Sequence, residues 1–200
     1  MAFLVIANVF GMLLFIYLFW RRLKEDYSSD IIFSTALTTL LGLGVALFIA
    51  LYVFPKYWFW ITFVGASIGM LVGVVKYNLR IYEVIEGMVI SLLPWLGLVY
   101  LVMAVSSRSA IVLVGFAIVL LCLVIYGVLN KYYKGFSWYK SGKVGFAGIT
   151  TLGVYFLARA VVAIASSDML SFIGKYEVVV SALATFVCFA ALFRLSKKAV

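Results

Sequence analysis

Residues 109–129 read SAIVLVGFAIVLLCLVIYGVL and contain no charged side chain. The hydrocarbon core of a bilayer is about 30 Å thick, and a helix needs about 20 mostly apolar residues to cross it. This stretch therefore predicts a transmembrane helix. Six other segments have the same character, and the seven predicted spans cover residues 2–20, 31–54, 57–75, 82–105, 109–129, 144–165 and 177–193.

The composition of the whole chain also predicts a membrane protein. Of its 200 residues, 67% are hydrophobic and 12% are charged, whereas a soluble domain is about 45–50% apolar and about 25% charged. Too few polar side chains are present to cover a water-soluble globule of this size. The composition excludes a cytosolic enzyme, a secreted domain and a disordered segment. We expect an all-α, multi-pass membrane protein with a single transmembrane domain over residues 1–200.

The basic residues are distributed unevenly between the two ends of the predicted helices. The loops after spans one, three and five and the tail share an excess of Lys and Arg: Arg21, Arg22, Lys24, Lys76, Arg80, Lys131, Lys134, Lys140, Lys143, Arg194, Lys197 and Lys198. The opposite loops hold Lys56, Arg108 and Lys175. Because such an excess marks the cytoplasmic side, we expect the N-terminus outside and the C-terminus in the cytoplasm. This placement explains the net charge of +9 without a nucleic-acid partner.

The chain contains no histidine, and its two cysteines, Cys122 and Cys188, lie in separate apolar runs. The absence of histidine excludes a His-ligated metal ion, a Ser-His-Asp triad and an imidazole base. The cysteines form no C-x-x-C pair, and we expect both to be small buried apolar side chains. The sequence therefore predicts neither a cofactor nor a metal site.

Arg159 is the most unusual residue because it lies inside span six, about 22 Å from the predicted inner end. A guanidinium keeps its charge there, at a cost of roughly 2.5–3.5 kcal/mol at the bilayer centre. Tyr155 lies one turn earlier on the same face. Either Arg159 extends outward to the interface, or it faces an internal cavity and binds an anion such as a lipid phosphate. Arg108 and Lys175 are either ordinary loop charges or add positive potential near that cavity.

Two sets of residues in spans three and four have alternative interpretations. Gly65, Gly69 and Gly73 share one helix face, where they either let another helix approach closely or leave room for a lipid headgroup. Glu83 and Glu86 share a face at the predicted inner end of span four. These carboxylates either pair with Lys76 or Arg80 or perform acid–base chemistry.

Residues 143–159 read KVGFAGITTLGVYFLAR. This stretch resembles the Gly-rich beginning of span six, followed by Tyr-x-x-x-Arg, in the prolipoprotein diacylglyceryl transferase family. Members of that family are seven-span enzymes of the bacterial inner membrane with the N-terminus outside. Residues 63–69, FVGASIG, are similar in glycine content to the family's His-Gly-Gly segment, and Val84-Ile-Glu86-Gly87 resembles the acidic start of its fourth span.

The chain departs from the family pattern at three places. The histidine of the His-Gly-Gly segment is absent, Ala163 stands where the family often has an acid, and Gly97-Leu-Val-Tyr100-Leu replaces the Arg-x-Gly-Asn-Phe motif. Without a histidine, activation of an acceptor thiol would have to come from a carboxylate or from the phosphate itself.

The resemblance implies transfer of diacylglycerol from phosphatidylglycerol to the lipobox cysteine of a prolipoprotein. In that reaction Arg159 would bind the phosphate, Tyr155 would hydrogen-bond to it, and Glu86 would orient a cation or act as a base. The residues that we expect to contact the lipid are Gly65, Gly69, Glu83 and Arg108. An alternative is a relative that binds anionic lipid or a partner without chemistry. A third is a small transporter, disfavoured because the sequence shows no convincing repeat and one deep charge.

Overall fold

The computed structural model describes residues 2–107, 109–136, 144–165 and 171–197. The described residues form seven long helices and no strand: α1 (Ala2–Leu23), α2 (Ser29–Val53), α3 (Trp58–Tyr77), α4 (Ile81–Ser107), α5 (Ala110–Tyr132), α6 (Phe146–Ala165) and α7 (Tyr176–Ser196). Two short 3-10 turns, η1 (Pro55–Tyr57) and η2 (Tyr133–Gly135), follow α2 and α5. Each of the seven helices is long and apolar enough to cross a membrane, so the predicted fold class is confirmed.

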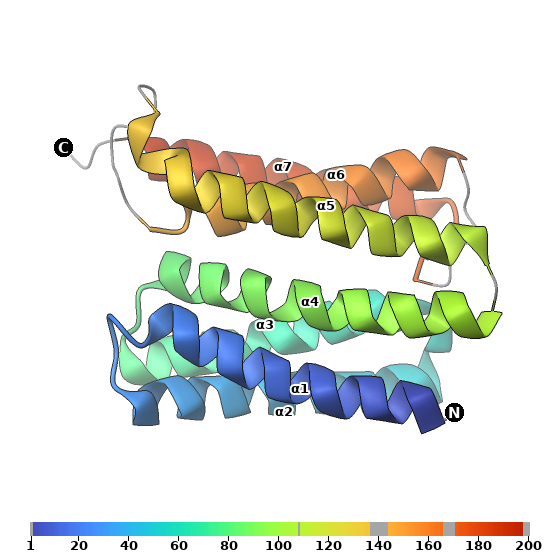
Figure 1. The fold of residues 1–200 in the computed structure, drawn as a ribbon, viewed down its shortest axis with the longest axis horizontal. Coiled ribbons are helices and arrows are strands. Elements are labelled where there is room, and N and C mark those ends of the chain that lie inside the picture. Colours follow the sequence, from blue (N-terminus) through green and yellow to red (C-terminus); the bar gives the residue numbers. More distant parts are fainter. Residues whose placement is uncertain (1, 108, 137–143, 166–170, 198–200) are drawn as a thin grey trace.

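Successive helices run in opposite directions, and the two termini lie at opposite ends of the bundle (Figure 1). We call these the N-terminal end, where α1 begins, and the C-terminal end, where α7 finishes. The observed helix bounds lie within three residues of the predicted spans. Helix α1 extends beyond its predicted span because it continues through Arg21 and Arg22 past its apolar part. Which end faces the cytoplasm stays a prediction from the distribution of basic residues.

The helices pack in three groups. Three pairs make the most extensive contacts: α2 packs on α3, α1 packs on α4, and α6 packs on α7. Helix α4 also contacts α5 and α6. Figure 1 shows α5, α6 and α7 on one side of α4 and α1, α2 and α3 on the other. Helix α4 therefore joins the two sides of the bundle.

Small residues bring α2 and α3 into close contact. A Cβ atom on Gly42 would press against the Gly65 carbonyl oxygen, and one on Gly69 would press against the Thr38 carbonyl oxygen. One turn further along, a Cβ on Gly73 would lie 2.6 Å from Thr35 Cγ2. This spacing is typical of tightly packed membrane helices, so the helix-packing interpretation of the glycine stripe is confirmed.

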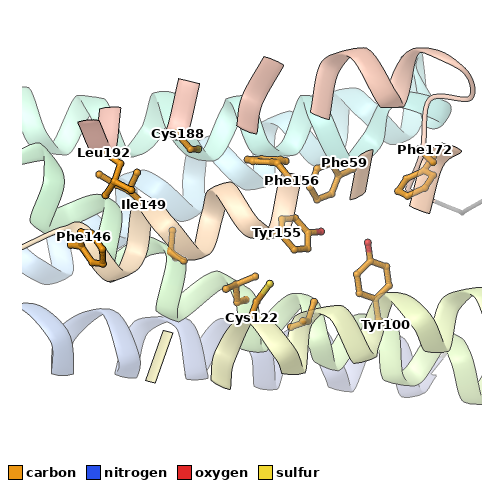
Figure 2. Close-up of a cluster of buried hydrophobic side chains, with 14 of the residues drawn as sticks. Phe59, Tyr100, Cys122, Phe146, Ile149, Tyr155, Phe156, Phe172, Cys188 and Leu192 are labelled. Atoms are coloured by element: carbon orange, nitrogen blue, oxygen red, sulfur yellow. The ribbon is translucent and has the colours of Figure 1, made fainter. Parts of the chain in front are cut away.

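Two clusters of buried apolar side chains lie inside the bundle. One is formed mainly by α4, α5, α6 and α7, and Figure 2 shows members of it, among them Tyr100, Phe146 and Phe156. The other lies between α1, α2, α3 and α4 around Phe15 and Phe19. Cys122 and Cys188 are both buried and free, as predicted.

Candidate functional site

An apolar cavity of about 670 Å³ lies between the α2–α3 pair on one side and parts of α1, α4 and α6 on the other. One face of α4 lines it, and the members of this face are spaced three or four residues apart: Ile85, Met88, Leu92, Leu96, Val99 and Met103. From Ile85 to Met103 this face extends about 27 Å along the helix at a rise of about 1.5 Å per residue. The cavity is therefore a tall slot that runs parallel to the helices.

A few polar groups line this slot, and no charged side chain is among the described residues that line it. Asn8 accepts a hydrogen bond from Trp95 Nε1 at 3.2 Å and donates one to the Leu4 carbonyl oxygen at 2.8 Å. The hydroxyl of Ser67 is bonded to the Phe63 carbonyl oxygen of its own helix at 2.8 Å. The slot is suited to hydrocarbon and unsuited to an ion.

Arg159 is buried inside the bundle beside this slot, where it forms an ion pair with Glu177. Its side chain is 3% exposed, and that of Glu177 is 0% exposed. Arg159 Nε lies 2.9 Å and Nη2 lies 2.7 Å from Glu177 Oε1. Arg159 therefore does not extend outward to the interface but lies inside the bundle, paired with a carboxylate. Binding of a lipid anion by Arg159 stays a prediction.

The remaining donors of Arg159 have partners inside the same cluster. Nη2 donates to the Ser171 carbonyl oxygen at 2.9 Å, and Nη1 donates to Ser171 Oγ at 3.1 Å and to the hydroxyls of Tyr155 at 3.4 Å and Tyr100 at 3.5 Å. A guanidinium has five N–H groups, and this arrangement engages all of them. An anion could bind Arg159 only by displacing one of these partners.

Aromatic rings lie between the ion pair and the slot. The ring of Phe59 stacks on the guanidinium of Arg159, with 3.8 Å between the guanidinium carbon and the ring centroid. Phe59 and Tyr155 both line the slot, and their ring centroids are 6.3 Å apart. Tyr155 and Arg159 also line a second, very small void of about 10 Å³. Figure 2 shows Phe59 and Tyr155 on neighbouring elements of the buried cluster.

Sequence reasoning missed Glu177 as the partner of Arg159. Glu177 Oε2 accepts a hydrogen bond from Trp60 Nε1 at 2.9 Å, and Oε1 accepts one from the Ser181 hydroxyl at 2.7 Å. The available signal was its place in the first turn of the seventh helix, at the same end of the bundle as the last turns of α6. Antiparallel packing of these two helices brings the two charges to the same depth.

Glu86 lies at the other end of the bundle, apart from Arg159. Its Oε1 accepts hydrogen bonds from Arg22 Nε at 2.9 Å and Nη2 at 2.6 Å, and its Oε2 accepts one from the backbone N–H of Gly145 at 2.7 Å. Gly145 directly precedes α6, and Arg159 lies about 20 Å further along that helix from its first residue. Of the predicted catalytic residues, the structure brings together Arg159 and Tyr155 but not Glu86.

Glu83 makes a separate set of contacts near the surface. Arg80 Nη1 donates to its Oε1 at 3.0 Å, and the Tyr27 hydroxyl donates to its Oε2 at 2.6 Å. Burial, followed by this bond to Glu83, raises the pKa of the Tyr27 hydroxyl. The predicted pairing with Arg80 is thus observed for Glu83. It was wrong for Glu86, because the packing of α1 on α4 places Arg22 beside the Glu86 carboxylate instead.

The other predicted lipid contacts lie elsewhere. Gly65 and Gly69 face α2, and neither is among the residues that line the slot. Arg108 lies outside the described residues, and Lys175 is exposed just before α7. A role of these residues in lipid binding stays a prediction.

Thr151 of α6 offers a test of polar packing in the core. It is fully buried, and its hydroxyl has no hydrogen-bond partner among the described residues. Replacing Thr151 with valine keeps the shape and removes an unsatisfied group, so we expect the free energy of unfolding to stay unchanged or to rise by up to about 1 kcal/mol. Titration of the detergent-solubilised protein with sodium dodecyl sulfate, followed by circular dichroism, measures this energy.

Thr185→Val is the matched control for that substitution. The Thr185 hydroxyl donates to the Ser181 carbonyl oxygen at 2.8 Å, so its removal is expected to cost about 1 kcal/mol. Equal losses in the two variants would contradict the assignment of Thr151 as unsatisfied.

Comparison of the chain with protein-family models, with curated proteins and with solved structures finds no match in any of the three. The relationship to the diacylglyceryl transferases therefore stays a prediction that rests on the sequence similarities of spans three, four and six.

Proposed function

We propose that this chain is a lipid-binding membrane protein in which an acyl chain occupies the slot between the α2–α3 pair and α4. The observation that carries the proposal is the slot itself, whose volume of about 670 Å³ falls within the roughly 300–1,000 Å³ of ligand pockets. Its lining is apolar over a height of about 27 Å, close to the thickness of a bilayer core of about 30 Å.

The physical reason for occupancy is packing. Inside a membrane the surrounding lipid is as apolar as the slot, so the hydrophobic effect adds little. An unfilled space, however, deprives the lining atoms of their van der Waals contacts. Acyl chains are the abundant molecules at this depth, and an extended chain matches a tall slot.

The surroundings of the slot at the N-terminal end favour an anionic headgroup. Pro55 lines the slot there, and the next residue, Lys56, is exposed. Lys56 Nζ would lie 3.7 Å from a Cβ on Gly174, so it is close to the exposed Lys175. Two cations at one mouth would attract a phosphate, and phosphatidylglycerol is the lipid that the sequence resemblance implies.

Transfer of diacylglycerol to a prolipoprotein is the second candidate, and the position of Tyr155 favours it. This side chain lines the slot, and its hydroxyl accepts a hydrogen bond from Arg159 Nη1 at 3.4 Å, so a lipid in the slot would be separated from the guanidinium by the rings of Tyr155 and Phe59. For diacylglyceryl transfer, Arg159 would have to release one of its hydrogen-bond partners and bind the lipid phosphate instead. Incorporation of radiolabelled diacylglycerol into a lipobox peptide tests this candidate, and wild-type protein that produces no labelled peptide would contradict it.

Ser67→Phe tests lipid binding by filling the slot. Ser67 lines the slot and is half-buried, so a phenyl ring there would occupy space that an acyl chain needs. If the steric cost of the added ring is about 1–3 kcal/mol, as for overpacking, lipid affinity is expected to fall by about 5- to 150-fold. Native mass spectrometry of the protein released from nanodiscs of phosphatidylglycerol and phosphatidylcholine measures the fraction that retains lipid.

Ile68→Phe is the matched control, because Ile68 is the adjacent residue of α3 and its side chain is 56% exposed. This variant adds a comparable ring to the outer surface, and we expect lipid retention as in the wild type. Retention that falls equally in both variants, or wild-type protein that retains no lipid, would contradict the proposal. Equal retention of the two lipids would contradict the preference for an anionic headgroup.

A further inference from the structure

The α2–α3 hairpin is joined to the rest of the chain at one end only. Residues 24–28 connect it to α1 and residues 78–80 connect it to α4, and both connections lie at the C-terminal end of the bundle (Figure 1). The turn between α2 and α3, at residues 54–57, lies at the N-terminal end. That end of the hairpin is held only by non-covalent contacts.

The hairpin is a compact unit in itself. Backbone contacts link Gly42 to Gly65 and Thr38 to Gly69, and the Tyr77 hydroxyl donates to Ser34 Oγ at 2.8 Å. Helix α3, in contrast, makes few close approaches to α4, because the slot lies between them. The hairpin can therefore be displaced as one body with little loss of its own packing.

At the N-terminal end, Trp60 attaches the hairpin to α6 and α7. Its Nε1 donates to Glu177 Oε2 at 2.9 Å, and its ring stacks on Phe156 with centroids 5.4 Å apart and planes 12° from parallel. Phe63, one turn further along α3, meets the same Phe156 ring edge-on at 5.3 Å. Phe59, at the same end of α3, adds the stacking of its ring on the Arg159 guanidinium at 3.8 Å. A hydrogen bond to a charged acceptor is stronger than one to a neutral group, so the Trp60–Glu177 bond is a substantial part of this attachment.

We propose that the α2–α3 hairpin is a lateral gate to the slot, hinged at the C-terminal end and latched by Trp60. Leu51 and Pro55 line the slot and are exposed, so the slot is already partly open. Movement of the free end of the hairpin away from α6 would widen this opening toward the bilayer, the direction from which a lipid chain must arrive. Hinges commonly lie at the ends of helices, as residues 24–28 and 78–80 do. The role of the gate rests on the lipid binding proposed above.

Distances between spin labels test the gate directly. One pair is placed at the N-terminal end, at Phe54 of the hairpin and Tyr176 of α7, and a second pair at the C-terminal end, at Val75 of the hairpin and Tyr132 of α5. All four side chains are more than half exposed. The labels are introduced in a background in which Cys122 and Cys188 are replaced with alanine, and distances are measured by double electron–electron resonance in nanodiscs.

Trp60→Phe removes the indole N–H and keeps a ring for the contact with Phe156. We expect it to raise the population with a lengthened 54–176 distance about tenfold, and Trp60→Ala to raise it further, with the 75–132 distance unchanged. Trp20→Phe is the matched control. Trp20 Nε1 also donates one hydrogen bond, to Ser29 Oγ at 3.2 Å, but at the hinge end, so the 54–176 distance should stay as in the background protein.

The outcomes distinguish failure of the proposed gate from failure of the proposed lipid binding. An unchanged 54–176 distance in both Trp60 variants overturns the gate, and so does lengthening of both distances together, which indicates loosening of the whole bundle. Lipid retention of the same samples is measured by native mass spectrometry. Samples that retain lipid without any change in distance contradict the gate alone, whereas samples that change distance but never retain lipid contradict the proposed lipid binding.

Discussion

Replacing Glu177 with alanine is expected to lower the free energy of unfolding by about 3–5 kcal/mol, because it leaves a buried guanidinium without its counter-charge. Arg159 cannot lose its proton, and its side chain is 3% exposed, so water cannot replace the carboxylate without local unfolding. The substitution also removes the acceptor for Trp60 and Ser181. Titration with sodium dodecyl sulfate, followed by circular dichroism, measures the loss.

The double variant Arg159→Ala, Glu177→Ala distinguishes an ion pair from two independent contacts. Once both charges are absent, neither is left uncompensated, so we expect the combined loss to be smaller than the sum of the single losses by about 1–3 kcal/mol. Arg159→Ala alone should be milder than Glu177→Ala, because a carboxyl group can be neutralised by a proton whereas a guanidinium cannot. Strictly additive losses would contradict the ion pair as the main interaction.

Replacing Gly69 with alanine is expected to separate α2 from α3 and to lower the free energy of unfolding by about 1–3 kcal/mol. The added Cβ would press against the Thr38 carbonyl oxygen and lie 2.9 Å from Thr39 Cα. Both are backbone atoms, so no side-chain rotation can relieve the overlap. The same detergent titration measures the loss.

Gly44→Ala provides the control on the same hairpin. A Cβ on Gly44 would meet nothing within 4 Å, and alanine is the better helix former, so this variant is expected to be neutral or up to about 1 kcal/mol more stable. If Gly69→Ala proved as benign as Gly44→Ala, the close backbone contact between α2 and α3 would not be a feature of the protein in its membrane.

The apolar runs predicted the helices well because length and composition alone determine which segments can cross a bilayer. Residues 109–129, for example, lie almost entirely within α5. The bounds were less predictable, since a helix does not stop where the hydrocarbon does. Helix α1 continues through Arg21 and Arg22, whose long side chains can reach polar surroundings from a helical backbone.

The contacts between helices could not be predicted in the same way. The sequence identified Arg159 as unusual, but its partner depended on α7 packing beside α6. Likewise, the glycine spacing showed that Gly65 and Gly69 share a face, but not that this face meets α2. The slot is a space left by the arrangement of several helices, so no single segment carries a pattern for it.

The contact between α1 and α4 bears on the order in which the chain assembles during synthesis. Arg22 leaves the ribosome 64 residues before its partner Glu86, which at roughly 5–20 residues per second corresponds to a delay of about 3–13 seconds. The α2–α3 hairpin is complete before then and can pack on itself from contacts close in sequence. Helix α1 thus docks on α4 only after α2 and α3 have paired, and until α4 is inserted its polar end must be accommodated by lipid headgroups or by the insertion machinery.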